Sequence, residues 1–249
     1  MLPLLLFEGF PFMKKKDHLL NYIIFVIILV VCVAVVLLLF FFLRYKKEDK
    51  VYEDIRESAV ITSDSGERAI NFDFLEEYSG DAVCSWITIP GTVIDYPLVH
   101  AEDNEYYLDH DAFGNPASSG AIFLNCYNNV SLSDPKTIIF GHSMKDGSMF
   151  HELHKYADSS FGNEHNTLLI YMLDGSIKQY HLLCEKKTTS DDAAVYTMFD
   201  MQDSGECAEY LASEADLVYS DPMDSNVLIL STCVKGKDRR VVVFQEDQI

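Results

Sequence analysis

The sequence lacks the patterns by which proteins hold structural zinc or calcium. No Cys-x-x-Cys pair occurs, cysteines and histidines form no paired cluster, and no acidic segment has the spacing of a calcium-binding loop. Of the six cysteines, Cys32 lies in an apolar N-terminal segment, which leaves an odd number in the remainder. We therefore expect no metal site, no disulfide framework and at least one free thiol.

Positive charge is also scarce, since 19 Lys and Arg stand against 39 Asp and Glu for a net charge of −20. Residues 1–50 hold seven basic and four acidic residues, so the other 199 residues carry −23. A domain this acidic is not expected to follow a nucleic-acid backbone, which is bound by Lys and Arg. The same charge argues against adsorption to anionic lipid.

One long apolar segment interrupts this polar composition. Residues 19–43 contain no charged residue, and as a helix they would span about 37 Å, enough to cross a bilayer core. No small-residue cleavage site follows, which favours a retained signal anchor over a removed signal peptide. Lysines flank the segment on both sides, so the charge rule does not favour an exported C-terminus. Met13 offers an alternative start, which the sequence leaves open.

The rest of the chain reads mainly as short strands. Residues 44–70 form a charged linker or helix, Phe72–Tyr78 has the pattern of a short amphipathic helix, and residues 71–249 form one domain. Residues 206–215 have helical spacing within a long connection, 188–224. The expected strands are a hairpin over 86–99 and the runs 121–124, 137–140, 168–171, 177–184, 227–230 and 241–244. About eight strands with few helices predict a closed β-barrel.

A thiol, an imidazole and a guanidinium lie where three of these strands end. Cys233 follows the run 227–230, His142 follows 137–140 after a glycine, and Arg240 precedes 241–244. A nearby cation favours the thiolate, the reactive form of cysteine. Each residue taken alone also fits a structural role, as a small buried cysteine, a hydrogen-bonded histidine or a solvated arginine. Arg239 competes with Arg240, because adjacent residues of a strand face opposite sides.

Taken together, these residues resemble the sortases, and class B sortases in particular. Leu230-Ser-Thr-Cys233 matches the family signature TLxTC, with Ile229 in place of the usual threonine. Ile139–Phe150 resembles the class B stretch around the catalytic histidine. Further similar stretches are 86–97, 103–108 and 120–123, so the resemblance extends from about Phe72 to the C-terminus.

The resemblance implies an eight-stranded sortase-type β-barrel with N-terminal helices and a helix in the long loop before the cysteine strand. It implies a cysteine transpeptidase that cleaves a C-terminal sorting signal of secreted proteins after Thr and transfers the acyl group to a cell-wall peptide amine or a pilin lysine. Residues 1–18 would be cytoplasmic, 19–43 would anchor the chain in the cell membrane, and 71–249 would be the extracellular catalytic domain. The chemistry requires no cofactor.

By the same resemblance, Cys233 is the nucleophile, His142 the acid and base, and Arg240 the oxyanion donor. The implied substrate-binding residues are Asn104, Leu108, Tyr196 and Ser231. Two other hypotheses remain open from the sequence. A thiol endopeptidase that releases the acyl group to water would use the same three residues, and a surface adhesion domain would use none of them.

Overall fold

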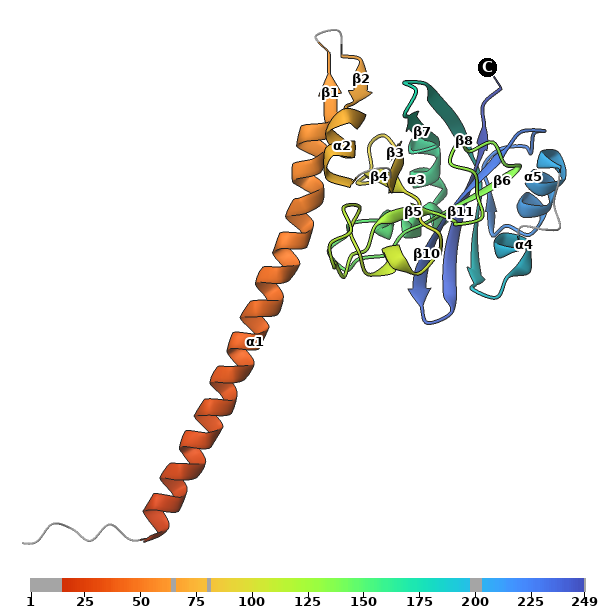
Figure 1. Cartoon of the computed structure of the whole chain (residues 1–249). Helices are drawn as coiled ribbons and strands as arrows, with labels where there is room; N and C mark the ends of the chain where they lie inside the picture. The colour runs from red at the N-terminus through yellow and green to blue at the C-terminus, as the bar shows by residue number, and fades with distance from the viewer. Residues whose placement is uncertain (1–14, 64–65, 80–81, 198–202, 249) are drawn as a thin grey trace, which may run out of the picture. The chain divides into compact units, whose positions relative to one another are not determined.

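The structure, a computed structural model, describes residues 15–63, 66–79, 82–197 and 203–248 (Figure 1). It divides into two units, Met1–Lys47 and Glu48–Ile249. The helix α1 (Lys15–Ala59) runs through the first unit and into the second.

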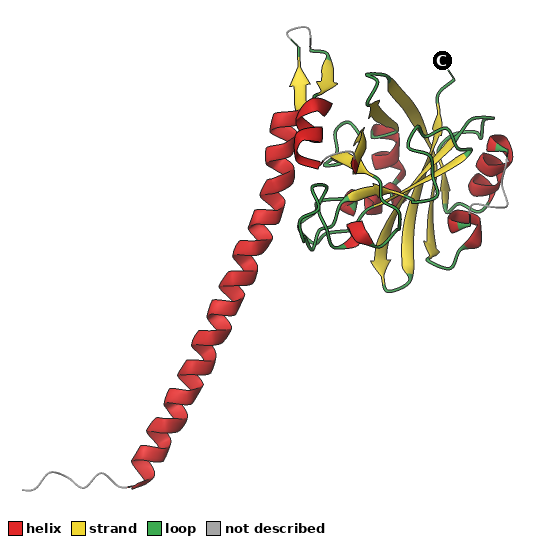
Figure 2. Cartoon of the chain, in the orientation of Figure 1, coloured by secondary structure: helices red, strands yellow, loops and turns green. Residues whose placement is uncertain are grey.

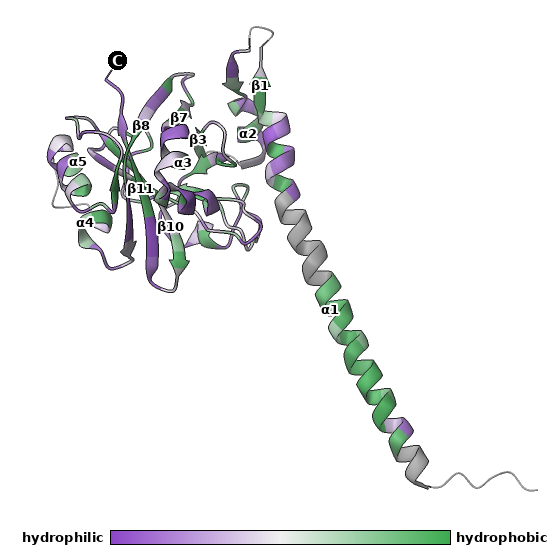
Figure 3. Cartoon of the chain, turned by 180° about the vertical axis from the view of Figure 1, so that it is seen from behind, coloured by the Kyte–Doolittle hydropathy of each residue, from purple (hydrophilic) through white to green (hydrophobic). Residues whose placement is uncertain are grey.

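The apolar helix expected at the N-terminus is present. Leu20–Leu39 is long and apolar enough to cross a membrane, and Figure 3 colours this part of α1 mostly as hydrophobic. Its exposed residues are almost entirely hydrophobic. Of the linker or helix expected over residues 44–70, the first part is helical, because α1 continues without a break to Ala59. Residues 44–59 contain neither glycine nor proline and are rich in Lys and Glu, which favour a helix.

A small hairpin and a short helix follow α1. The strands β1 (Val60–Thr62) and β2 (Arg68–Ile70) pair antiparallel, where the sequence had indicated only a loop. The helix α2 (Phe72–Ser79) confirms the predicted amphipathic helix, with Leu75 buried. Tyr52, Ile55 and Ala59 of α1 are buried in the core of the Glu48–Ile249 unit, which anchors the end of this helix.

Eight strands form the expected closed barrel (Figure 2). They are β3 (Val83–Thr88), β4 (Asp95–Val99), β5 (Ile122–Leu124), β6 (Lys136–Phe140), β7 (Thr167–Met172), β8 (Ile177–Thr189), β10 (Val227–Lys235) and β11 (Asp238–Glu246). Their order is β11-β10-β6-β5-β4-β3-β7-β8, and β11–β8 pairing closes the ring. The two-residue strand β9 (Leu217–Val218) pairs with β8 outside this ring.

The sheet is mixed, and its two parallel pairs determine where the important residues meet. The β3–β4 hairpin turns at Pro90-Gly91, as the sequence predicts. In contrast, β4 pairs with β5 and β6 pairs with β10 in parallel. The residues that follow β6 and those at the end of β10 therefore leave the sheet at the same edge.

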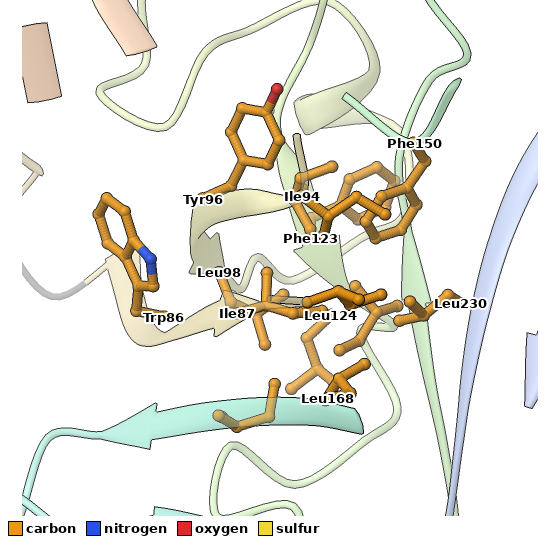
Figure 4. Packing of buried hydrophobic residues seen from close by; sticks show 14 of the residues in the cluster. Trp86, Ile87, Ile94, Tyr96, Leu98, Phe123, Leu124, Phe150, Leu168 and Leu230 are labelled. Carbon is orange, nitrogen blue, oxygen red and sulfur yellow. The ribbon is translucent and has the colours of Figure 1, made fainter. Parts of the chain in front are cut away.

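Apolar side chains pack on both faces of the β10–β11 pair. The main core contains Leu228, Leu230, Val242 and Phe244 together with the side chains of the β3–β6 region drawn in Figure 4. A second cluster contains Val227, Ile229, Val241 and Val243 and is covered by α4 (Ala193–Tyr196) and α5 (Ser204–Ser213). Residues of each strand alternate between these two clusters, as the pleat requires.

The long connection before β10 carries helices, as expected, with α5 close to the predicted 206–215. Residues 198–202 of that connection lie outside the described residues. The sequence analysis missed the helical segment between β6 and β7. There, the 3₁₀ helix η3 (His151–Ala157) and α3 (Ser159–Glu164) bury Leu153 and Tyr156 in the main core.

Candidate active site

The ends of β6 and β10 form the floor of a groove of about 300 Å³. Phe140 and Ser231 are register partners in the parallel pair, so the next residues of each strand lie side by side. The groove is lined by Asn104, Leu108, Phe123, Phe140, Gly141, His142, Ser190, Tyr196, Ser231, Thr232, Cys233 and Arg239. Six of the seven residues selected from the sequence therefore meet in one groove.

Cys233 is more exposed than Cys84, Cys184 and Cys207, which are buried, and it shares its half-buried state with Cys126. All six cysteines of the chain are free, and Cys233 is half-buried in the groove. Burial raises the pKa of Cys84 and Cys207 to about 11 and that of Cys184 to about 12, so these thiols stay protonated. Cys233 therefore combines access to solvent with a place beside an imidazole.

The His142 ring is oriented by backbone on the opposite side of the groove. Its Nε2 donates to the carbonyl oxygen of Leu108 at 2.7 Å, which leaves Nδ1 of the neutral ring as a proton acceptor. Gly120 lies against the ring at φ +59°, and a Cβ there would lie 2.5 Å from the Tyr107 carbonyl and 3.1 Å from His142 Cδ2. A residue with a side chain would displace the ring.

Two hydrogen bonds fix the cysteine strand to the histidine segment. Thr232 Oγ1 donates to the Gly141 carbonyl at 2.7 Å, and the Gly141 amide donates to the Ser231 carbonyl at 3.2 Å. Both involve Gly141, the neighbour of His142, and a residue one or two positions before Cys233. The relative position of thiol and imidazole is therefore set by the sheet itself.

The arginine that lines the groove is Arg239, whereas the interpretation of the sequence preferred Arg240. Cys233 is paired with Arg239 across β10–β11, and opposed residues of antiparallel strands share a face. Arg240 is paired with Thr232, on the other face, and its Nη1 binds the Glu185 carboxylate. A bulge between Cys233 and Lys235 sets this register.

The four predicted substrate-binding residues all line the groove. The Tyr196 hydroxyl and Ser231 Oγ are 2.8 Å apart, and burial raises the pKa of Tyr196, which keeps that hydroxyl protonated. Asn104 Oδ1 accepts the backbone N–H of Cys126 at 2.8 Å, which fixes its amide. Leu108 is 44 % exposed, so its side chain presents apolar surface to a ligand.

Lys136 supports Tyr196 by binding the backbone on either side of it. This lysine was not identified from the sequence. Its ammonium is buried at the start of β6 and donates to the carbonyls of Ala194 and Thr197 at 2.9 and 2.7 Å. These carbonyls lie in α4 and at its C-terminal end, where a cation is favourable. The sequence offered no signal beyond one lysine at the start of an apolar run.

A second polar cluster lies on the other side of the cysteine strand. Ser143 Oγ is 3.1 Å from His151 Nδ1 and 2.9 Å from His154 Nε2, and His154 also bonds the backbone of Cys233. Burial, aided by nearby Arg240 and by His151, lowers the pKa of His154. These two histidines were not selected from the sequence, although their spacing of three residues places both on one side of η3.

The described residues contain no group of three or more His, Cys, Asp or Glu that could hold a metal ion. The groove thus presents a thiol, an imidazole, a guanidinium and hydroxyls. This set can carry out acyl transfer through a thioester.

Comparisons with known proteins agree with this chemistry. The Sortase domain family matches residues 87–247. Sortase B of Listeria monocytogenes is 33% identical over 187 residues, which is 72% of this chain and 74% of the relative.

Solved structures extend the similarity to the fold. The crystal structure of sortase B from Bacillus anthracis is 26% identical with a TM-score of 0.69 and covers 84% of this chain and 100% of its own. A Streptococcus pyogenes class B sortase involved in pilus biogenesis is 27% identical with a TM-score of 0.65 and covers 71% of this chain and 98% of its own. The chain therefore belongs to the sortase family, as a cysteine transpeptidase of the sortase B type.

Proposed function

We propose that this sortase cleaves a C-terminal sorting signal of secreted proteins after a threonine and transfers the acyl group to an amine of the cell-wall peptide. The observation that carries the proposal is the shared groove, in which a solvent-accessible thiol and an oriented imidazole lie beside hydroxyl and amide groups. A groove of this kind suits an extended peptide whose carbonyl must reach the sulfur.

In the first half-reaction, the Cys233 thiol gives its proton to His142 Nδ1, and the resulting thiolate attacks the threonine carbonyl carbon. A carbon–sulfur bond forms, and the carbonyl oxygen takes the negative charge of a tetrahedral intermediate. His142 then gives a proton to the departing amine as the carbon–nitrogen bond breaks, which leaves a thioester on Cys233. The Leu108 carbonyl supports this role, because it holds Nε2 and leaves Nδ1 to exchange the proton.

The oxyanion requires a donor that is in place before the reaction. We assign this role to Arg239, because it lines the groove on the same face as Cys233. A guanidinium is permanently charged and offers several N–H donors. The sequence had favoured Arg240, which remains the competing assignment and is tested by paired substitutions below.

The substrate residues divide between the two sides of the proposed peptide path. Ser231 and Tyr196 form a hydroxyl pair next to the thiol, which suits the polar groups of a peptide backbone. Asn104 and Leu108 offer an amide and an apolar side chain on the His142 side. Substitution of either pair is expected to raise the KM for the sorting peptide more than it lowers kcat.

We also propose that residues 19–43 anchor the chain in the cell membrane, with residues 1–18 cytoplasmic and 71–249 outside. The apolar part of α1 supports this arrangement by its length and composition. The orientation follows from the proposed substrates, which are exported proteins and the cell wall. Protease treatment of intact cells should remove the catalytic domain, whereas protection of that domain would contradict the orientation.

The direct test incubates the full chain in detergent micelles with sorting-motif peptides, with and without an amine acceptor. The proposed function predicts cleavage after Thr and a product whose mass includes the acceptor. Cleavage to the free acid even at saturating acceptor would favour a thiol endopeptidase. Preference for a lysine of a folded pilin would favour polymerisation, which the Streptococcus pyogenes relative makes the second candidate.

A further inference from the structure

Tyr52 carries a buried hydroxyl that the proposed reaction does not use. It lies on α1, the same continuous helix that contains the apolar segment Leu20–Leu39, and it belongs to the Glu48–Ile249 unit. Only 6% of the residue is exposed, and its ring packs edge-on against Tyr96, labelled in Figure 4, with the ring centroids 5.4 Å apart. Burial raises the pKa of Tyr52, so its hydroxyl keeps its proton and remains a hydrogen-bond donor.

The Tyr52 hydroxyl binds both arms of one loop, residues 108–120. It donates to the carbonyl oxygen of Gly120 at 2.8 Å and accepts the backbone N–H of Ala112 at 3.2 Å. Both hydrogen bonds are buried, and together they use the donor and an acceptor site of the hydroxyl. One side chain of α1 therefore fixes this loop at two points.

The two ends of the same loop hold the ring of His142. The Leu108 carbonyl accepts the Nε2 proton at 2.7 Å, and Gly120 lies against the ring, where a Cβ on this glycine would come within 3.1 Å of Cδ2. That Cβ would also lie 3.0 Å from the Leu108 carbonyl oxygen, so the two ends of the loop are close to each other. A displacement of either end would turn the imidazole.

Loss of the hydroxyl alone would leave two buried backbone groups without this partner. An unmade hydrogen bond to a buried group costs more than a made one contributes, so the loop is expected to shift until water or another group replaces the bond. A shift of Gly120 moves the surface on which the imidazole rests and changes its distance to the Leu108 carbonyl. The Tyr52 hydroxyl thus acts on His142 without touching it.

We propose that Tyr52 is a positioning residue for the transpeptidation, which holds the His142 imidazole in its working orientation through the loop 108–120. The inference rests on the proposed role of His142 and adds the helix of the apolar segment to the parts of the chain that the reaction needs. Tyr52 touches neither the substrate nor the reacting atoms. Its hydroxyl should therefore matter for the chemical step and little for binding of the sorting peptide.

The test replaces Tyr52 by phenylalanine in the full chain in detergent micelles, which removes one oxygen atom and keeps the ring. Tyr156→Phe is the matched control, because Tyr156 is also buried and its hydroxyl also donates to a backbone carbonyl, that of His165, at 2.8 Å. Tyr156 lies outside both the loop and the groove. The two variants should lower the urea midpoint by similar amounts, so their comparison separates positioning from stability.

Tyr52→Phe is expected to lower kcat for a fixed sorting peptide about tenfold, as one lost hydrogen bond can, with KM changed by less than about twofold. Tyr156→Phe should keep kcat near the wild-type value. Long-range ¹H–¹⁵N NMR of the histidine rings at about pH 8.5, where histidine is neutral, gives a readout independent of activity. His142 should carry its proton on Nε2 in the wild-type chain, whereas Tyr52→Phe should show a mixture of both tautomers.

A second variant, Gly120→Ala, disturbs the same contact from the side of the ring. If Tyr52 acts through Gly120, the double variant should lose little more kcat than Gly120→Ala alone, as is expected of coupled positions. Fully additive losses, equal losses of kcat in the two tyrosine variants, or wild-type His142 signals in Tyr52→Phe would each overturn the inference. The His142 signals are assigned by their absence from the His142→Gln chain.

The NMR signals also separate failure of this inference from failure of the proposed function. A His142 tautomer that depends on Tyr52, in a chain that forms no amine product, would retain the positioning role and reject the proposed function. Transpeptidation by a chain whose His142 signals do not depend on Tyr52 would do the reverse.

Discussion

Both faces of the β10–β11 pair carry a hydroxyl side chain and an arginine, but the two faces differ in which of these side chains can contact a ligand. On the groove face, Cys233 and Arg239 are half-buried and line the groove, while Ser231 is buried and its hydroxyl bonds that of Tyr196. On the other face, Thr232 and Arg240 are enclosed, and Arg240 binds Glu185, which is 1% exposed. A shift of one residue thus separates a guanidinium available to substrate from one committed to a buried ion pair.

This difference shows that the groove residues are supported by a set of hydrogen-bonded residues on the opposite face of the strand pair. Beneath Cys233 and His142, Thr232 bonds Gly141, and His154 connects Ser143 to the cysteine backbone. Side chains on the groove face can move with the substrate, whereas those below are fixed by buried hydrogen bonds. Changes on the first face should affect activity, and changes on the second should affect stability first.

The largest effect is expected from the thiol. Cys233→Ala should reduce cleavage of a sorting peptide by at least about 10³-fold, because no other group can form the thioester. Cys126→Ala, which removes another partly exposed thiol, is the matched control and should retain activity. Steady-state cleavage followed by mass spectrometry measures both, and loss of activity in the control variant would show that the groove depends on more than one thiol.

The two arginines test the comparison itself. Arg239→Ala should lower kcat/KM about 10²-fold with little change in stability, as removal of an oxyanion donor does. Arg240→Ala should destabilise the fold by about 3 kcal/mol, because it leaves the buried Glu185 carboxylate without its partner. Kinetics and urea unfolding on both variants decide the matter. If Arg240→Ala abolished activity at unchanged stability, the assignment made from the sequence would be restored.

Lys136 is expected to give an intermediate effect. Lys136→Met removes both bonds to the α4 carbonyls, so Tyr196 loses its support and the KM for the sorting peptide should rise about fivefold. Lys178→Met is the control, because the Lys178 ammonium also has a partner, Glu246 on the neighbouring strand β11, but lies outside the groove. A larger fall in kcat than rise in KM would show that α4 serves the chemical step and not substrate binding.

Much of this molecule could be predicted from apolar pattern and turn residues. The runs 137–140 and 227–230 marked the two parallel strands, and Pro90-Gly91 marked the hairpin. These signals are local, so a sequence carries them. The convergence of Cys233 and His142 came from the family resemblance, because the parallel β6–β10 pairing that produces it joins residues far apart in the chain.

The parts that could not be predicted depend on register or on burial of charge. Whether Arg239 or Arg240 faces the groove depends on the bulge after Cys233. The residue types around Cys233 do not predict that bulge. Glu185 and Lys136 are charged residues inside the fold, where composition rules place apolar ones. The His151 and His154 pair became meaningful only when η3 placed it against the cysteine strand.

The smallest expected effect is a change in how the free energy of unfolding depends on pH. It comes from His154, on the face of the strand pair away from the groove. His154 is approached by Arg240 and by His151 and bonds Ser143 and the Cys233 backbone, and its pKa is lowered mainly by burial. A histidine with a lowered pKa binds fewer protons when folded than when unfolded, so stability is complete above the ordinary histidine pKa of about 6.5 and is lost as pH falls below it.

His154→Gln keeps a hydrogen-bonding group toward Ser143 but cannot be protonated, so it should flatten this dependence. Urea unfolding between about pH 7.5 and about pH 5 measures it, and the wild-type chain should lose more free energy of unfolding than the variant. His110→Gln, at a histidine in a loop away from the cysteine strand, is the control and should follow the wild type. Parallel curves for wild type and His154→Gln would mean that neither burial nor the nearby Arg240 lowers the pKa of His154 in the folded chain, which would contradict the prediction.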